Sequence, residues 1–78
     1  MNQLLIPVEW EMYLTSSNKK LFITLGHDEE KMVYYYLYSF NEIDDCICAG
    51  IDMEWMKWKK DEFVKDRNLK LIKKGKFK

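Results

Sequence analysis

The sequence predicts one small, mainly β domain, a barrel of five or six short strands with one helical turn before the last strand. Three observations favour it. The 78-residue chain is long enough for a single domain. Hydrophobic residues make up 47% of it, and three Trp, five Tyr and four Phe supply the aromatic types enriched in strands. Short runs in which apolar and polar residues alternate are separated by turn-type clusters.

We expect the barrel-like domain to cover residues 1–72 and a basic tail to cover residues 73–78. The first residues lack the basic region of a signal peptide, and their apolar run stops at Pro7. We therefore expect a cytoplasmic protein whose Cys46 and Cys48 stay reduced.

The first predicted strand covers residues 8–14, where the pattern has a period of two. Its core face is expected to carry Val8, Trp10, Met12 and Leu14. Its solvent face is expected to carry Glu9, Glu11 and Tyr13. After a turn at residues 16–19, a second strand over residues 21–25 should bury Leu21, Ile23 and Leu25.

The third segment, residues 32–38, fits two structures. Its β-branched and aromatic content favours a strand, which is our preferred prediction. The alternative is an α+β domain with a helix at about residues 29–42, begun by Asp28 as a cap. A short strand over residues 46–51 should follow, with Ile47, Ala49 and Ile51 on one face.

Residues 52–65 are also ambiguous. We prefer a strand to Trp58 and then one helical turn over residues 61–65. A continuous helix is the other solution, and it would place Met53, Met56, Phe63 and Val64 along one side. A last short strand is expected over residues 69–72.

The C-terminal third resembles a known class of small proteins. The stretch Trp58-Lys59-Lys60-Asp61-Glu62-Phe63-Val64, followed by Leu69-Lys70-Leu71-Ile72, is similar to the closing segment of short SH3-like β-barrel proteins of phages and prophages of low-GC bacteria. The resemblance covers about fifteen residues. It implies an SH3-like barrel and an origin in a mobile element, and it transfers no active site.

Catalysis is not indicated, and we expect a protein that is not an enzyme and holds no metal or cofactor. A structural zinc site needs four N or S ligands, whereas Cys46, Cys48 and His27 are the only candidates. The two cysteines are therefore read as small buried hydrophobic residues. His27 is read as a solvated histidine of an acidic loop, since no nucleophile stands at a recognisable spacing from it.

Charge is divided between the two ends of the neutral chain. Residues 1–56 carry ten acidic residues against three lysines, a net charge of −7. Residues 57–78 carry nine lysines and one arginine against three acidic residues, a net charge of +7. Such a distribution can attract a charged partner.

The preferred function is a non-catalytic protein-interaction module, such as a phage-encoded modulator or inhibitor of a host protein. Aromatic side chains are the usual anchors of protein interfaces, and acidic ones would steer the domain to a partner with a basic surface. The predicted anchors are Trp55, Tyr34, Tyr36 and Tyr38. The predicted steering residues are Asp28, Glu29, Glu30, Glu42, Asp44 and Asp45.

The alternative is a small nucleic-acid-binding domain. The three tyrosines would stack on bases, and basic residues near the C-terminus would meet phosphates. Those basic residues are Lys70, Lys73, Lys74 and Lys76. No membrane association is expected, and both a monomer and a homodimer fit the sequence.

Overall fold

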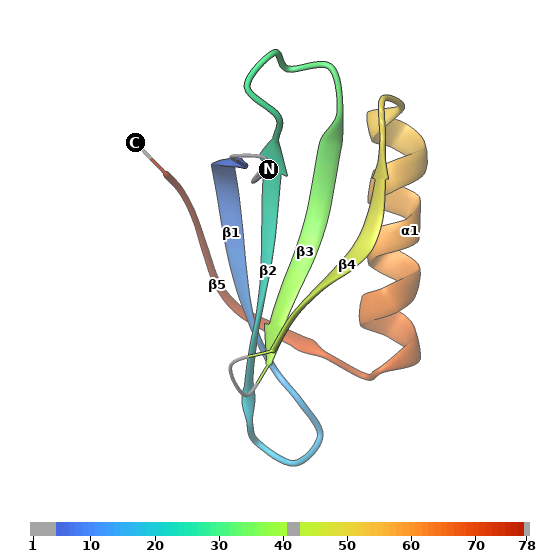
Figure 1. The fold of residues 1–78 in the computed structure, drawn as a ribbon. Coiled ribbons are helices and arrows are strands. Elements are labelled where there is room, and N and C mark those ends of the chain that lie inside the picture. Colours follow the sequence, from blue (N-terminus) through green and yellow to red (C-terminus); the bar gives the residue numbers. More distant parts are fainter. Residues whose placement is uncertain (1–4, 41–42, 78) are drawn as a thin grey trace.

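The computed structural model describes residues 5–40 and 43–77. These residues form five strands and one helix. The elements are β1 (Ile6–Leu14), β2 (Lys20–His27), β3 (Tyr34–Phe40), β4 (Ile43–Gly50), α1 (Met53–Asp66) and β5 (Lys70–Lys76). Every strand pairing is antiparallel, and the strands form one sheet in the order β4-β3-β2-β1-β5 (Figure 1). The prediction of a mainly β fold is confirmed, but the sheet is open and does not close into a barrel.

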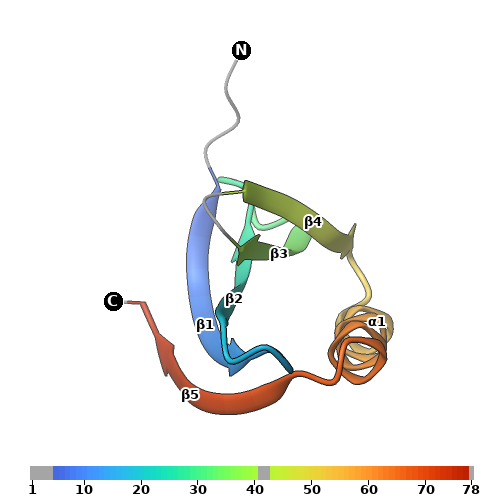
Figure 2. The ribbon, with the colours of Figure 1, turned by 90° about the horizontal axis from the view of Figure 1, so that it is seen from below.

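The sheet is strongly curved, and α1 stands on its open side between the two edge strands, β4 and β5 (Figure 2). The helix packs chiefly on β4 and to a smaller extent on β3. The sheet therefore has an inner face, which is turned toward α1, and an outer face that no element among the described residues covers. The core and the candidate binding surfaces are described below by the face on which they lie.

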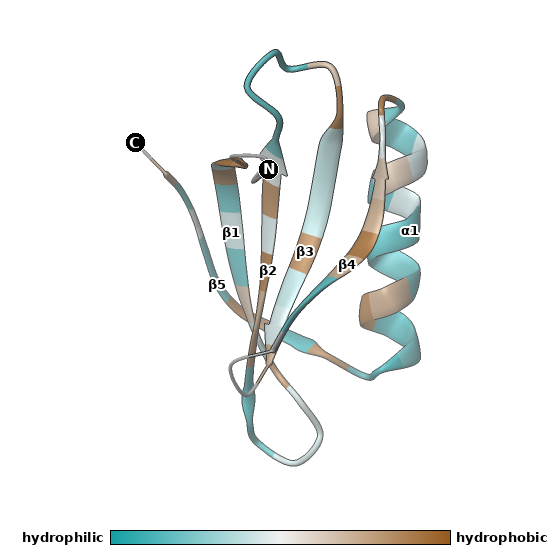
Figure 3. Cartoon of the chain, in the orientation of Figure 1, coloured by the Kyte–Doolittle hydropathy of each residue, from teal (hydrophilic) through white to brown (hydrophobic). Residues whose placement is uncertain are grey.

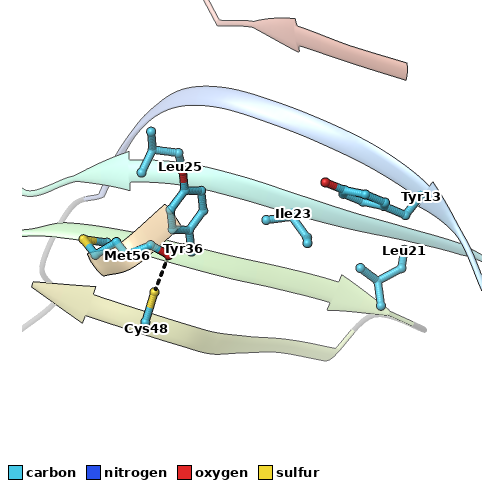
Figure 4. Packing of buried hydrophobic residues seen from close by; sticks show 7 residues of the cluster. All are labelled: Tyr13, Leu21, Ile23, Leu25, Tyr36, Cys48 and Met56. Atoms are coloured by element: carbon cyan, nitrogen blue, oxygen red, sulfur yellow. Dashed lines mark hydrogen bonds between the residues drawn. The ribbon is translucent and has the colours of Figure 1, made fainter. Parts of the chain in front are cut away.

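The core lies on the inner face, between the sheet and α1 (Figure 4). Leu21, Ile23 and Leu25 of β2 are buried there, as the sequence pattern predicts. The other buried hydrophobic residues are Tyr13, Tyr36, Cys48 and Met56. In a 78-residue chain this core is small, so partly buried side chains of α1 and β3 pack around it and extend it.

The faces of β1 are opposite to those predicted. Tyr13 is buried and Glu11 points to the inner face, because they pair with the core residues Leu21 and Ile23. The apolar residues Trp10 and Met12 lie on the outer face instead. The physical reason is that the inner face supplies cations for the carboxylates of β1, and β5 places Lys74 opposite Glu11 and Lys76 opposite Glu9.

Residues 53–66 form one continuous helix, so the predicted strand to Trp58 and the single helical turn at 61–65 are wrong. Asp52 has extended backbone and its side chain accepts hydrogen bonds from the backbone N–H groups of Glu54 and Trp55, which starts the helix. The helix ends at Asp66, and the positive φ of 52° at Asn68 turns the chain away from the helix axis. Its sheet-facing side carries Met53, Met56, Phe63 and Val64.

The third segment is the strand β3, so the alternative of a helix at about residues 29–42 is wrong. Cys48 of β4 is buried, whereas Ala49 and Ile51, which follows the strand, are exposed. The β3–β4 pairing is irregular at Ile47, which packs against the core, so the single face expected for Ile47, Ala49 and Ile51 is wrong.

The basic segment near the C-terminus belongs to the sheet. β5 extends to Lys76, so residues 73–76, which we expected in a tail, are hydrogen-bonded to β1. Phe77 continues this pairing through its N–H, which donates to the Val8 carbonyl at 2.9 Å. Lys78 lies outside the described residues. The lysines of β5 consequently have fixed faces.

Candidate binding surfaces

The three predicted tyrosine anchors share the inner face of β3. Tyr36 has only 6% of its surface exposed, since it lies beneath α1. The ring of Tyr38 packs on Phe63 of α1 at 4.8 Å between centroids, and Tyr34 meets His27 edge to face at 5.5 Å. Tyr36 and Tyr38 join the helix to the sheet, and Tyr34 packs on His27, so the three rings do not form an exposed row on which bases could stack.

The predicted acidic residues fall into two groups at opposite ends of β3. Asp28, Glu29 and Glu30 precede β3, whereas Asp44 and Asp45 lie at the start of β4, next to the far end of β3. Seven strand residues separate the groups by about 20 Å. Glu42 lies outside the described residues. The acidic residues therefore do not form one continuous rim.

Two of these carboxylates have local partners. Asp28 accepts hydrogen bonds from the backbone N–H groups of Met32 and Val33 at 2.8 and 3.3 Å, and so shapes the loop between β2 and β3. Asp45 accepts one from Cys46 N–H at 2.8 Å. Glu29 and Glu30 are exposed in the same loop. This loop and the start of α1, with Asp52 and Glu54, lie at the same end of the molecule (Figure 1).

Two tryptophans are exposed on the surface of α1. Trp55 and Trp58 have 44% and 55% of their surface accessible. Lys59 Nζ lies 5.6 Å from the centroids of both rings, within cation–π range. We call Trp55, Trp58 and Lys59 the tryptophan surface. Of the predicted anchors, Trp55 is thus exposed, and Trp58 joins it because the segment is helical.

No family model, curated protein or solved structure matches the chain. Its function must therefore be argued from the surfaces themselves. Within residues 5–40 and 43–77, no helix has both the length and the apolar character needed to cross a bilayer.

A second aromatic surface lies on the outer face of the sheet. A hollow of about 390 Å³ there is lined by Trp10, Phe22, Thr24, Ser39 and Phe77. Sequence reasoning missed this surface because it assigned Trp10 to the core. The alternation that put Trp10 and Met12 on one face was correct, and only the choice of which face is buried was wrong.

The four predicted lysines of β5 divide between the faces of the sheet. Lys70 and Lys73 pair with Leu14 and Met12 and so share the outer face. Lys74 and Lys76 lie opposite Glu11 and Glu9 on the inner face. β5 is mostly hydrophilic along its length (Figure 3). β5 therefore contributes lysines to both faces of the sheet. Only the lysines on the inner face lie opposite acidic residues of β1.

The inner face also holds a compact polar cluster. Lys60 Nζ lies 3.2 Å from Glu11 Oε1, and the Tyr13 hydroxyl donates to the same oxygen at 2.9 Å. Burial raises the pKa of Tyr36 to about 12, with the nearby Glu11 carboxylate as the next cause. Burial and the hydrogen bond to Glu11 raise the pKa of Tyr13 well above its usual range. Both phenols therefore stay neutral at physiological pH, and the cluster holds α1 on the sheet.

The two cysteines and His27 do not form a common site. Cys48 is buried, with its Sγ donating to the Met56 carbonyl at 3.6 Å. Cys46 is exposed, so its assignment as a buried hydrophobic residue is wrong. His27 is buried at the end of β2, so its assignment to a solvated loop is wrong. Its Nδ1 donates to the Asp28 carbonyl. The described part of the chain holds no group of three or more His, Cys, Asp or Glu residues placed to share a metal ion.

Proposed function

We propose that the chain is a non-catalytic protein-interaction module that binds its partner through the tryptophan surface of α1. The main support is that two tryptophans one helical turn apart are exposed, each with about half of its surface accessible. Tryptophan is enriched at the energetic centres of protein interfaces, where its large apolar area becomes buried. A free domain gains nothing from leaving two such side chains in water.

The surroundings of the tryptophan surface favour a partner with a basic surface. The ring of Trp55 reaches back toward β4, where its Cζ3 lies 3.8 Å from the position of a Cβ on Gly50. That end of the molecule also carries the acidic loop at residues 28–30 and the acidic start of α1. Acidic groups beside an aromatic anchor would raise the association rate with a cationic partner.

The SH3-like class and the phage or prophage origin belong to this proposal. The helical segment immediately before the last strand supports the first, although the helix is far longer than one turn. A small modulator that blocks a host protein would need an exposed anchor and no active site, as proposed here.

The test is a pull-down from nuclease-treated bacterial lysate with tagged protein at two salt concentrations. The wild type should retain one stoichiometric protein in about 0.3 M salt, where exposed charges are largely screened. The double variant Trp55→Ala/Trp58→Ala should lose it. Phe77→Ala is the matched control, because it removes an equally exposed aromatic ring from the outer face.

Both variants should unfold at nearly the wild-type temperature, since exposed side chains contribute little to stability. Retention of the same partner by the double tryptophan variant would refute the proposal. Loss of the partner after nuclease treatment of the wild-type sample would also refute it, because the captured protein would then be bound through nucleic acid.

A further inference from the structure

The outer face of the sheet carries aromatic and basic side chains in adjacent rows. The register defines these rows, because residues opposite each other in an antiparallel pair share a face. One row contains Lys70, Leu14 and Lys20. The next contains Lys73, Met12, Phe22 and Ser39, and the third contains Gly75, Trp10, Thr24 and Leu37.

Gly75 determines where the indole of Trp10 lies. A Cβ at residue 75 would stand 2.7–2.9 Å from Cζ2, Cε2 and Nε1 of Trp10, closer than such atoms approach. The absence of a side chain thus lets the indole extend over the backbone of β5. There it lines the hollow together with Phe22 and Phe77, of which 40% and 46% is exposed.

On β5, β1 and β2 the charged side chains of the outer face are all basic. Lys20, Lys70 and Lys73 lie on it, whereas the two carboxylates of β1 point to the inner face. Among the described residues of β5, β1 and β2, no acidic side chain shares the outer face. Asp44 of β4, opposite Ser39, lies at the far edge of the sheet. The overall neutrality of the chain therefore hides a locally cationic aromatic surface.

We propose that this outer face binds single-stranded nucleic acid. Trp10, Phe22 and Phe77 would stack on unpaired bases, and Lys20, Lys70 and Lys73 would contact the phosphates between them. Single strands expose both faces of their bases, and aromatic side chains bordered by cations are the usual way to bind them without sequence preference. A duplex hides its base faces, so it would use the lysines alone.

This surface is independent of the tryptophan surface. The outer face lies on the opposite side of the sheet from α1 (Figure 2). A single chain could therefore hold a nucleic acid and a protein at the same time, and the failure of one proposal would leave the other standing.

The first test measures affinity by fluorescence anisotropy of labelled oligo(dT) and oligo(rU) of about a dozen nucleotides. Three phosphate contacts on a single strand predict a slope near −2 for log K against log salt, a loss of about 16-fold from 50 to 200 mM. Lys73→Gln should reduce the slope by about 0.7. Lys57→Gln, an exposed lysine of α1, should leave the slope unchanged. Comparing the two oligonucleotides tells DNA from RNA.

The second test reports on Trp10 directly. Trp10, Trp55 and Trp58 are the three tryptophans of the chain, so Trp55→Phe/Trp58→Phe leaves Trp10 as the only indole. Its fluorescence should be quenched when oligo(dT) binds. Phe77→Ala should weaken binding by about 5-fold or more, the loss of one stacked base. Gly75→Val, which must displace the indole, should weaken binding as well, and Phe77→Ala keeps the test valid if Gly75→Val does not fold.

Three results would overturn the proposal. The first is no binding at low salt, or binding that Lys73→Gln and Phe77→Ala leave unchanged. The second is duplex DNA that competes as well as the single strand, which would exclude base stacking. The third is a concentration-dependent dimer in sedimentation that Phe22→Ser dissociates, because the outer face would then bind a second copy of the chain.

Discussion

Lys60 Nζ lies 3.2 Å from Glu11 Oε1, and this ion pair connects α1 to β1, a strand on which the helix does not otherwise pack extensively. Only 14% and 20% of the two side chains is exposed. The Tyr13 hydroxyl donates to the same carboxylate oxygen. Glu11 thus joins the helix, the first strand and the core at one atom, and that role explains why a carboxylate stands on the inner face.

Lys60→Met should lower the free energy of unfolding by about 2 kcal/mol, because it removes the cation in contact with the largely buried Glu11 carboxylate. For a domain of this size the melting temperature should fall by about 10 °C. Thermal unfolding followed by circular dichroism measures the change. Lys57→Met, at an exposed position of the same helix, should change stability by less than about 0.5 kcal/mol. A fall as large for Lys57→Met would show that the ion pair is not the cause.

Glu11→Gln combined with Lys60→Met should be less destabilising than the sum of the two single changes. The two side chains touch, so removing both leaves no uncompensated charge. A double-mutant cycle in urea measures this coupling. Strict additivity would contradict the pairing of Glu11 with Lys60.

Stability should decline in alkaline solution as the buried tyrosines ionise. Burial raises the pKa of Tyr36 to about 12 in the folded state, whereas the unfolded side chain titrates near 10. A raised folded pKa means that the stabilisation is complete below pH 10 and is lost as the pH rises from 10 to 12. Urea unfolding at several alkaline pH values should show a shallower decline for Tyr36→Phe than for the wild type.

The two cysteines should differ sharply in reactivity. Cys48 is buried, and burial followed by the neighbouring Cys46 raises the pKa of its thiol. Cys46 is exposed, although partial burial and the Asp45 carboxylate raise the pKa of its thiol too. A thiol reagent should therefore modify one cysteine per native molecule, and the second only in denaturant. Cys46→Ser should abolish the native reaction, and rapid labelling of that variant would contradict the burial of Cys48.

The strands were largely predictable because their pattern is local. Leu21, Ile23 and Leu25 of β2 repeat with a period of two between turns, and both neighbours in the sheet agree with that pattern. The faces of β1 were not predictable in the same way. Trp10 and Met12 are more hydrophobic than Glu9 and Glu11, and the inner position of Glu11 depends on Lys60, a residue 49 positions further along the chain.

The tryptophan surface could have been found from the sequence. Asp52 before Glu54 is a helix-start signal, and Met53, Met56, Phe63 and Val64 have helical spacing. Aromatic content instead favoured a strand, which placed Trp55 and Trp58 on opposite faces. The outer-face hollow could not have been found, since it requires β5 to pair with β1 and to place Gly75 opposite Trp10.

Asp52→Ala should loosen the start of α1. Its Oδ1 accepts hydrogen bonds from Glu54 N–H at 3.1 Å and Trp55 N–H at 3.2 Å. These N–H groups lie in the first turn, so no preceding turn of the helix offers them a carbonyl. Loss of the cap should cost about 1 kcal/mol, or about 4–8 °C in melting temperature.

Asp66→Ala, at the other end of the helix, is the control. A carboxylate at a helix C-terminus opposes the helix dipole, so this change should be neutral or slightly stabilising. Because the first turn carries Trp55, Asp52→Ala should also weaken capture of the protein partner, whereas Asp66→Ala should not. Equal melting temperatures for Asp52→Ala and the wild type would show that packing of Met53 and Met56 alone starts the helix. The position of the tryptophan surface would then depend on the core and not on the Asp52 cap.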